Sequence, residues 1–259
     1  MKNNRRVVEN RQKQILGLVR EKGEVRADEL SSALGVSVMT IRRDLGLLES
    51  QKLLRRTHGG AVSFERVHTA RRFGEEVQVC RDRISKFAAG YLEDGDRIFI
   101  NGSRVALNML EYVRNCRVAA FTNNGWAAGV KYPDGVSVHF TGGEMRGYLM
   151  IGEYVIRNLL SVTADKTFFG CAAVYDNGEF RYDIPSEIAI NEMMISRTNG
   201  QVYVLADHTK LKNRSQEEEH FQGGITYERS IILVTDSLAD PAVVESLKER
   251  GMEVVQVPV

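Results

Sequence analysis

The organisation of this chain can be worked out from one stretch, Val36-Ser37-Val38-Met39-Thr40-Ile41-Arg42-Arg43-Asp44-Leu45. Ser37 is a good N-cap, and the residues from Val38 to about Gln51 follow it with the spacing of an amphipathic helix. One face of this helix collects the apolar side chains Ile41, Leu45 and Leu48. Met39 and Arg43 project from the opposite face, so we expect that face to meet solvent or a partner.

Two further helices are expected on the N-terminal side of this stretch. Apolar residues recur at i, i+3 and i+4 within Arg11–Glu21, and Ala27–Leu34 forms a second, short helix that ends at Gly35. Two short helices joined by a tight, glycine-containing turn are the sequence form of a helix-turn-helix. In that motif the first residues of the second helix enter the major groove. The readout candidates are therefore Ser37, Met39, Thr40, Arg42 and Arg43.

Residues 52–62 have the pattern of a β-hairpin, which would be the wing of a winged helix. The Gly59–Gly60 pair allows positive φ, and Arg55 and Arg56 can hold DNA phosphates. His58 and Gly59 complete the DNA-binding candidates. Residues 1–62 contain 13 Lys and Arg against 7 Asp and Glu, a balance of +6, whereas the remaining residues hold 22 against 27, a balance of −5. A small basic domain joined to an acidic body suggests nucleic-acid binding.

The chain as a whole has an ordinary globular composition. Its 259 residues are 43% apolar or aromatic and 27% charged, which excludes a disordered chain and a collagen-like repeat. Three cysteines without a C-x-x-C pair indicate reduced thiols. The polar N-terminus predicts no signal peptide, and the lack of any run of about 18 uncharged apolar residues predicts no membrane span. We therefore expect a cytoplasmic protein without a membrane partner, with a winged helix over 1–62, a linker over 63–80 and a larger domain over 81–259.

Apolar strands and helices alternate through the larger domain. The expected strands are Arg97–Ile100, Val118–Phe121, Val136–Phe140, Thr167–Cys171, Gln201–Leu205, Ile231–Val234 and Glu253–Val257. The expected helices are Asp82–Leu92, Val105–Arg114, Gly152–Leu160, Ser186–Arg197 and Pro241–Arg250. This alternation predicts an α/β fold whose mostly parallel, Rossmann-like sheet is covered by helices on both faces. Such sheets bind ligands at the carboxyl ends of their strands.

Four of these strand ends carry polar or glycine-rich sequences that suit an anion. They are Asn101-Gly102-Ser103-Arg104, Thr122-Asn123-Asn124, Thr141-Gly142-Gly143 with Arg146 just beyond, and Asp207 with Lys210. Backbone N–H groups at a helix start, hydroxyls and arginine side chains favour phosphate or carboxylate. Any one of these sequences by itself is more typical of a simple tight turn. Four of them at one edge of one sheet favour a binding site.

Several of these residues belong to longer motifs. The run Thr40-Ile41-Arg42-Arg43-Asp44-Leu45, with Arg56-Thr57-His58-Gly59-Gly60-Ala61 after it, closely resembles the DeoR family of bacterial transcriptional regulators. This match covers nearly all of residues 10–62. Residues 82–240 resemble the sensor domain of the same family more loosely, and Gly142-Gly143-Glu144-Met145-Arg146 preserves its G-G-x-x-R pattern.

The resemblance implies a sensor fold related to ribose-5-phosphate isomerase, and a phosphorylated sugar or a related anionic metabolite as effector. It also implies that Glu187 and the segment Ala206–Lys210 contribute to the effector site. The sequence departs from the family at two positions, because Asn101 and Arg104 stand where the family has an acid and a threonine. Arg104 adds a cation beside the expected anion site, which could suit a doubly anionic ligand.

The favoured function is that of a sequence-specific transcriptional repressor of a carbohydrate-utilisation operon. An activator or dual regulator is the alternative. An isomerase or deaminase acting on sugar phosphates is disfavoured, because such enzymes need positioned carboxylates and Asn101 replaces an acid. We expect no catalytic residue and no cofactor, and the spacing of the five histidines predicts no metal site. One winged helix offers a small reading surface, so a homodimer or higher homo-oligomer on double-stranded operator DNA is expected.

Overall fold

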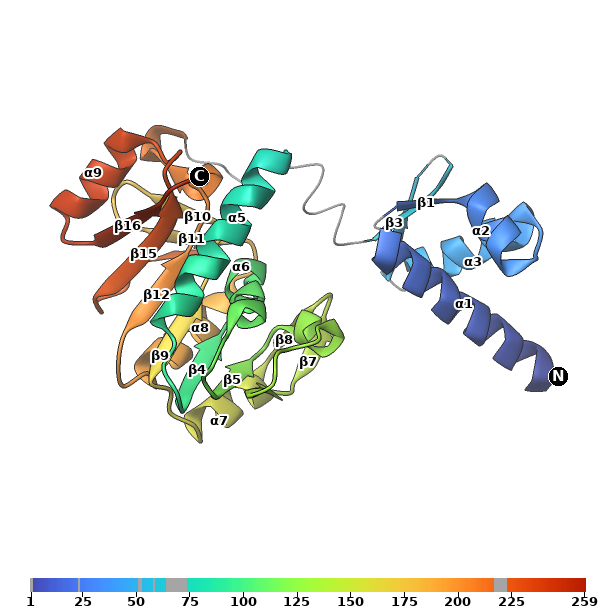
Figure 1. The fold of residues 1–259 in the computed structure, drawn as a ribbon, viewed down its shortest axis with the longest axis horizontal. Coiled ribbons are helices and arrows are strands. Elements are labelled where there is room, and N and C mark those ends of the chain that lie inside the picture. The colour runs from blue at the N-terminus through green and yellow to red at the C-terminus, as the bar shows by residue number, and fades with distance from the viewer. Residues whose placement is uncertain (1, 23, 51–52, 58, 64–73, 217–222) are drawn as a thin grey trace. The chain divides into compact units, whose positions relative to one another are not determined.

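The computed structural model describes residues 2–22, 24–50, 53–57, 59–63, 74–216 and 223–259 (Figure 1). The chain divides into two compact units, Met1–Glu75 and Glu76–Val259. No helix within the described residues is long and apolar enough to cross a membrane.

The N-terminal unit is a winged helix. Its elements are α1 (Lys2–Lys22), β1 (Glu24–Arg26), α2 (Ala27–Leu34), α3 (Val38–Ser50), β2 (Leu54–Arg56) and β3 (Gly60–Ser63). Strand β3 lies between β1 and β2 in an antiparallel sheet. Apolar side chains from all three helices and from the sheet form its core: Ile15, Val19, Val25, Ala27, Leu30, Ile41, Leu45, Leu48, Leu54 and Ala61. The predicted helix-turn-helix and hairpin are confirmed.

Helix α1 begins at Lys2, earlier than the expected Arg11. Two further features of this unit were not predicted. The pattern did not predict β1, because a three-residue strand is too short to show a period. Gly60 does not use the positive φ that a glycine allows. Gly60 is needed instead because β1 passes close by: a Cβ at this position would lie 1.9 Å from the carbonyl oxygen of Val25.

The second unit is built on a sheet of seven parallel strands in the order β16-β15-β12-β9-β4-β5-β6. Their bounds are β4 (Asp96–Ile100), β5 (Val118–Thr122), β6 (Val136–Phe140), β9 (Lys166–Phe169), β12 (Val202–Leu205), β15 (Ile231–Asp236) and β16 (Glu253–Val257). Each predicted strand is found in this sheet. The predicted α/β fold with a parallel sheet is confirmed.

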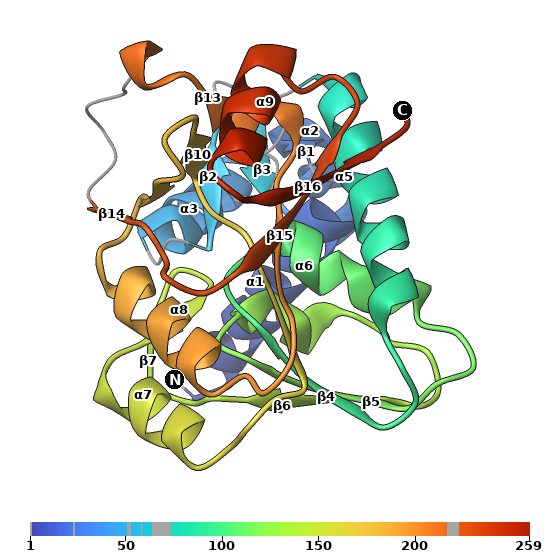
Figure 2. The same ribbon diagram turned by 90° about the vertical axis from the view of Figure 1, so that its left-hand side faces the viewer.

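Helices cover both faces of this sheet (Figure 2). They are α5 (Glu75–Ala88), α6 (Arg104–Asn108), α7 (Glu153–Leu160), α8 (Ser186–Ser196) and α9 (Pro241–Glu249). Alternate residues of a strand point to opposite faces, so Ile98 and Ile100 pack with α5 and α6, whereas Phe99 packs with α7 and α8. This two-sided burial explains why the central strands β4, β9, β12 and β15 are rich in apolar residues.

Helix α5 begins at Glu75, earlier than the expected Asp82. Val77, Cys80, Ile84 and Ala88 are all buried, so the helical spacing of its inner face extends back into the segment that was expected to be linker. The expected linker over 63–80 is therefore wrong at both ends, since β3 includes residue 63 and α5 includes residues 75–80.

The sequence did not predict the shorter strands of the second unit. Strands β7 (Glu144–Arg146) and β8 (Leu149–Ile151) form a hairpin. Strands β10 (Ala173–Tyr175), β11 (Phe180–Tyr182), β13 (Leu211–Lys212) and β14 (Gly223–Ile225) form a second sheet in the order β13-β10-β11-β14. Each has two or three residues, which is too few to show an alternating pattern.

Candidate DNA-reading surface and candidate effector site

The start of α3 is fixed by its own hydroxyl groups. Ser37 Oγ accepts a hydrogen bond from the backbone N–H of Thr40 at 3.2 Å, and the two side-chain hydroxyls are 2.9 Å apart. This is the N-cap predicted from the sequence, and it satisfies one of the free donors of the first turn. Ser37 and Thr40 therefore hold the helix start, whatever else they contact.

Three predicted readout residues project from the outer face of α3. Met39 is 72% exposed, and Arg42 and Arg43 are also exposed. A large apolar side chain between two arginines can meet a thymine methyl group, while arginine can bind a guanine edge through two hydrogen bonds. The structure thus brings an apolar and a cationic group together on the helix that enters the major groove in this fold.

A buried ion pair orients this helix from behind. Asp44 is 2% exposed, and its Oδ2 lies 2.5 Å from Arg11 Nε, while Gln12 donates to its Oδ1 at 3.4 Å. The pair joins α1 to α3. This role of Asp44 was not predicted, although the residue belongs to the motif on α3. The signal was present as a charged residue beside the apolar face of α3, with Arg11 as its partner on the first helix.

The structure describes three of the four predicted wing residues. The backbone N–H of Arg56 donates to Glu49 Oε1 at 2.8 Å, which fastens β2 to α3. The Arg56 side chain is exposed, and Arg55 lies on β2 opposite Val62. Gly59 is exposed, and its carbonyl oxygen accepts from the N–H of Ala27 at 2.8 Å. His58 lies outside the described residues.

Asn101 holds the carboxyl ends of β4 and β9 together. Its Nδ2 donates to Gly170 O at 2.9 Å and to Asn191 Oδ1 at 3.1 Å, and its Oδ1 accepts from the N–H groups of Ser103 at 3.0 Å and Gly170 at 3.1 Å. All four hydrogen bonds of the buried amide are thus internal. This also explains why β9 ends at Phe169 and not at Cys171, because the peptide groups of Gly170 pair with a side chain.

Ser103 and Arg104 begin α6 at the same strand end. Ser103 Oγ accepts from the N–H of Ala106 at 3.2 Å and is the N-cap of this helix. The guanidinium carbon of Arg104 lies 5.6 Å from the ring centroid of Trp126, which is itself stacked on Tyr148. This stack holds the Arg104 side chain against the loop after β5.

The three polar residues at the end of β5 fasten neighbouring loops. Thr122 Oγ1 accepts from the N–H of Asn124 at 3.0 Å, and Asn124 donates to Ser103 O at 3.3 Å. Asn123 donates from Nδ2 to Met150 O at 3.1 Å on the β7–β8 hairpin. Its Oδ1 is buried and has no hydrogen-bond partner among the described residues. That oxygen is the acceptor that this segment leaves available.

The two glycines after β6 allow the chain to pass close to β8 and α7. Gly142 and Gly143 have φ of 69° and 112°, and a Cβ on Gly143 would lie 2.7 Å from the carbonyl oxygen of Ile151. Arg146 lies on β7 with a side chain that is 65% exposed, and its Nε is 3.6 Å from Glu144 Oε1. Within the described residues, no hydrogen bond or ion pair joins Arg146 to the other predicted effector residues, so the structure does not bring it to their centre.

Glu187 meets Gly102 at the carboxyl end of β4. A Cβ on Gly102 would lie 3.3 Å from Glu187 Oε1, so the carboxylate and the backbone of Gly102 are in close proximity. Burial raises the pKa of Glu187 to about 7, with a further contribution from Asp183, while Lys210 opposes the shift. Glu187 therefore changes its charge near neutral pH, and its electrostatic surroundings include Lys210.

Asp207 and Lys210 follow β12 and are both anchored. Asp207 is fully buried, lies 2.7 Å from Arg81 Nε on α5, and accepts from the N–H of Thr209 at 3.1 Å. Burial alone would raise the pKa of Asp207, but the charges of Lys210 and Arg81 outweigh it and lower that pKa. Lys210 Nζ donates to Cys171 O at 2.6 Å. Asp207 is thus a structural link between β12 and α5.

These features define a helix-turn-helix protein with an α/β sensor unit. Residues 11–67 match the model of the DeoR-like helix-turn-helix domain, and residues 78–237 match that of the DeoR C-terminal sensor domain. The chain belongs to the DeoR family of regulators, whose members bind DNA, and it is not an enzyme of the isomerase or deaminase type.

Two similar bacterial regulators match this chain over more than nine-tenths of its length, and two further proteins match a smaller part. YulB, an HTH-type transcriptional regulator of Bacillus subtilis, is 31% identical over 97% of this chain and 98% of its own length. The repressor GlcR of the same organism is 26% identical, with 93% of each chain covered. The lactose phosphotransferase system repressor of Staphylococcus aureus is 31% identical over 76% of this chain and 82% of its own. Among solved structures, ribose 5-phosphate isomerase A of Methanocaldococcus jannaschii superposes with a TM-score of 0.38 and 14% identity, over 54% of this chain and 56% of that one.

Proposed function

We propose that this chain represses a carbohydrate-utilisation operon, and that a phosphorylated sugar bound at the carboxyl edge of its parallel sheet controls its affinity for operator DNA. Two relatives support the first half, since GlcR is a repressor and the staphylococcal relative represses a lactose phosphotransferase system. DNA reading belongs to the N-terminal unit and effector binding to the second. A regulator of bacterial transcription acts in the cytoplasm, where the DNA is.

The observation that carries the effector half is the meeting of Gly102 and Glu187 at the end of β4. Arg104 and Lys210 supply positive charge on either side, since the charge of Lys210 acts on Glu187 and that of Arg104 acts on Tyr148. In the proposed complex Arg104 and Lys210 attract the phosphate, and Glu187 accepts hydrogen bonds from sugar hydroxyls. The other effector candidates hold the loops in place: Asn101, Ser103, Thr122, Asn123, Asn124, Gly142, Gly143 and Asp207. Arg146 would contact the effector only if the β7–β8 hairpin contributes to the site.

The DNA half assigns base readout to Met39, Arg42 and Arg43, and phosphate contacts to Arg55 and Arg56, with His58 and Gly59 at the tip of the wing. We further propose a homodimer or higher homo-oligomer, because paired half-sites enlarge a small reading surface. Mass photometry of the full chain with and without operator DNA tests this assembly. A monomer in both conditions would contradict it.

The test of the effector half is a DNA-binding titration with the intact protein. Labelled DNA from upstream of the neighbouring genes is bound in the presence of a panel of sugar phosphates, each paired with its neutral sugar. One phosphorylated sugar should change operator affinity by about 5–150-fold, and its neutral parent should not. Arg104→Ala and Lys210→Ala should reduce this response without changing effector-free binding, and Arg146→Ala reports whether the hairpin contributes. A neutral sugar that acts as strongly as its phosphate would refute the anion site.

A reporter gene placed behind the operator separates the repressor from the activator. Deletion of the regulator should raise expression if the proposal holds. Reduced expression would favour the activator, which the sequence left open.

A further inference from the structure

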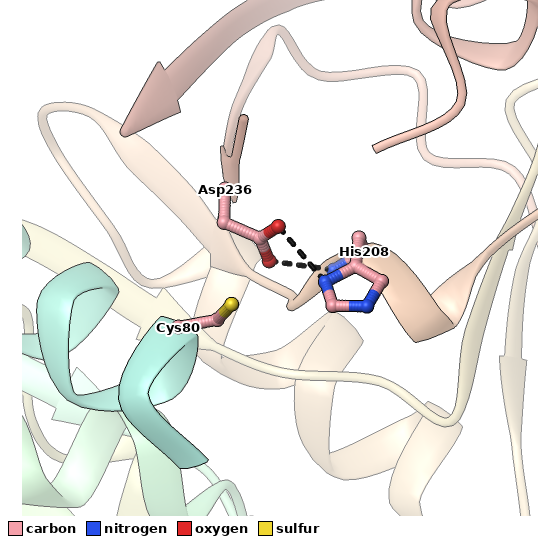
Figure 3. Close-up of side chains that lie close together, drawn as sticks. All are labelled: Cys80, His208 and Asp236. Carbon is pink, nitrogen blue, oxygen red and sulfur yellow. Dashed lines mark hydrogen bonds and ion pairs between the residues drawn. The ribbon is translucent and has the colours of Figure 1, made fainter. Parts of the chain in front are cut away.

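A cysteine, a histidine and an aspartate meet where α5 crosses the carboxyl ends of β12 and β15. Cys80 comes from α5, His208 begins the short helix η4 (His208–Lys210), and Asp236 is the last residue of β15 (Figure 3). Sγ of Cys80, one ring nitrogen of His208 and one carboxylate oxygen of Asp236 all lie within 4.8 Å of one another. These residues lie far apart in the sequence, so the spacing of histidines could not reveal the cluster.

Asp236 is fully buried at the centre of this cluster. Its Oδ1 accepts from His208 Nδ1 at 2.9 Å and from the N–H of Leu238 at 3.1 Å, and its Oδ2 accepts from the N–H of His208 at 2.8 Å. Cys80 is also fully buried, whereas the His208 side chain is 21% exposed. A buried carboxylate, a buried thiol and a ring that reaches solvent form a site that is closed on one side and open on the other.

This set of donors has the chemistry of a zinc site. Zn²⁺ binds cysteine sulfur, histidine nitrogen and carboxylate oxygen, and sites with three protein ligands keep a fourth position for water. A thiolate ligand favours zinc over Mg²⁺ or Ca²⁺, which prefer oxygen ligands alone. We propose that Cys80 Sγ, His208 Nδ1 and Asp236 Oδ1 bind one Zn²⁺ per chain, with a fourth ligand from solvent on the exposed side of His208.

The present geometry needs only a small adjustment to hold the ion. Zn–S bonds of about 2.3 Å and Zn–N bonds of about 2.0–2.1 Å place the ligand atoms of a tetrahedral site roughly 3.5 Å apart. The atoms of the cluster are within 4.8 Å, and His208 Nδ1 and Asp236 Oδ1 are 2.9 Å apart. The longest separation therefore has to shorten by at most about 1.3 Å, and the separation of His208 Nδ1 and Asp236 Oδ1 has to open by about 0.6 Å, with the ion taking the place of the proton between them.

Such an ion would tie the first helix of the sensor unit to the edge of the sheet. Cys80 is adjacent to Arg81, whose ion pair with Asp207 already links α5 to the end of β12. The zinc would add a second link between α5 and two strand ends. Binding to the native state alone stabilises it, by an amount that grows with the free zinc concentration. Zinc binding at this site can be tested without the proposed effector and without operator DNA.

The experiment uses the full-length chain without a purification tag, stripped of metal with a chelator. Zinc is titrated against a chromophoric competitor, and Co²⁺ is titrated separately, because a cobalt–thiolate bond gives a charge-transfer band in the near ultraviolet. We expect one zinc per chain, the cobalt–thiolate band, and a rise in Tm on adding zinc. Inductively coupled plasma mass spectrometry of the protein as purified measures the native metal content.

Two variants remove ligands, and one matched control removes a buried thiol elsewhere. Cys80→Ser keeps a small polar group in the core, and His208→Gln changes the partly exposed ligand, so circular dichroism can verify that both are folded. Loss of an outer-shell partner costs about 10–100-fold in zinc affinity, so loss of a direct ligand should cost more than about 100-fold. Cys171→Ser, which alters a buried thiol outside the cluster, should retain the affinity and the cobalt band.

Three results would overturn the site. The first is a wild-type chain that binds no zinc and shows no cobalt–thiolate band. The second is full zinc affinity in folded Cys80→Ser and His208→Gln, which would place the ion elsewhere. The third is loss of binding in Cys171→Ser with binding kept in Cys80→Ser. Operator affinity is not a readout here, so failure of the zinc site and failure of the proposed regulator are distinguishable.

Discussion

The motif residues of the two units differ in their exposure to solvent. On α3 the candidates Met39, Arg42 and Arg43 stand exposed on a helix whose orientation is fixed from behind by Asp44. At the strand ends of the second unit, Asn101 and most of its neighbours are buried in internal hydrogen bonds. The motif residues of the N-terminal unit are therefore exposed for contact, whereas those of the second unit mostly hold its loops in place.

The difference follows from what each unit must recognise. DNA is large and external, so its contacts have to project from the surface. A small effector needs a few groups held in a defined arrangement, and each loop that carries such a group must itself be fixed. In the proposed effector complex, Arg104, Glu187 and Lys210 would therefore act on the ligand, with the asparagines as their support.

Asn101→Ala tests this comparison most directly, because it removes the central support of the strand ends. The substitution leaves the N–H and carbonyl of Gly170, the N–H of Ser103 and Asn191 Oδ1 without their partner. Unsatisfied buried groups cost about 1–3 kcal/mol each and relax in part, so we expect a loss of about 3–5 kcal/mol in the free energy of unfolding. Trp126, the single tryptophan of the chain, lies in this unit, so its fluorescence in a urea titration reports the loss.

The exposed Asn199→Ala is the matched control and should leave the urea midpoint nearly unchanged. If Asn101→Ala is as stable as the control but fails to respond to effector, Asn101 contacts the ligand and the scaffold interpretation is wrong.

Asp44→Ala tests the corresponding support in the N-terminal unit. It leaves the Arg11 guanidinium largely buried and unpaired, since that side chain is 15% exposed. We expect a loss of about 2–4 kcal/mol in the stability of this unit, with partial relief as Arg11 turns toward solvent. Far-UV circular dichroism should show a separate, earlier helical transition, while the fluorescence of Trp126 stays unchanged.

The exposed pair of Arg26 and Asp28 provides the control, because Asp28→Ala should have almost no effect on unfolding. Coincident transitions of both units in Asp44→Ala would show that the two units unfold together, and would contradict the separate roles assumed for them.

The sequence predicts the long elements of this molecule, but not its shortest strands or the contacts between distant residues. The seven long strands and α2 were predictable because short segments rich in apolar residues and a clear helical period are present in the sequence. The hairpin β7–β8 and the second sheet were not, because strands of two or three residues have no measurable period. The support role of Asn101 could not be predicted either, since its partners Gly170 and Asn191 lie distant in the chain and meet it only in the fold.

Arg43→Ala and Arg56→Ala sharpen the comparison on the DNA side. If Arg43 binds a base edge, its loss should cost about 1–3 kcal/mol in operator binding and relax the preference at one base pair. Arg56→Ala should weaken operator and random DNA alike and reduce the salt dependence. Fluorescence anisotropy at several salt concentrations measures both. Equal losses of Arg43→Ala on operator and random DNA would remove Arg43 from base readout.

Glu187→Gln tests whether the sensor unit, like α3, keeps a group available for its ligand at the expense of stability. The pKa of Glu187 is raised from 4.5 to about 7, with burial as the largest cause and Asp183 as the next. Between these values the native state holds a proton that the unfolded chain has released. The free energy of unfolding therefore falls as pH rises through this window, and the penalty is complete above about pH 7.

A glutamine at position 187 cannot ionise, so the variant should lack this fall. We expect it to be more stable than the wild type by about 1–2 kcal/mol at pH 8, below the full value of the shift because water still reaches the site, and nearly equal to it at pH 4.5. Urea titrations followed by Trp126 at both pH values measure the difference, with the exposed Glu153→Gln as control.

Glu187→Gln should also respond less to the sugar phosphate, because an amide accepts fewer hydrogen bonds from hydroxyls than a carboxylate. Parallel pH profiles for Glu187→Gln and the wild type would show that Glu187 is not the group that titrates. A gain in stability with an undiminished effector response would mean that the carboxylate serves neither the ligand nor the fold.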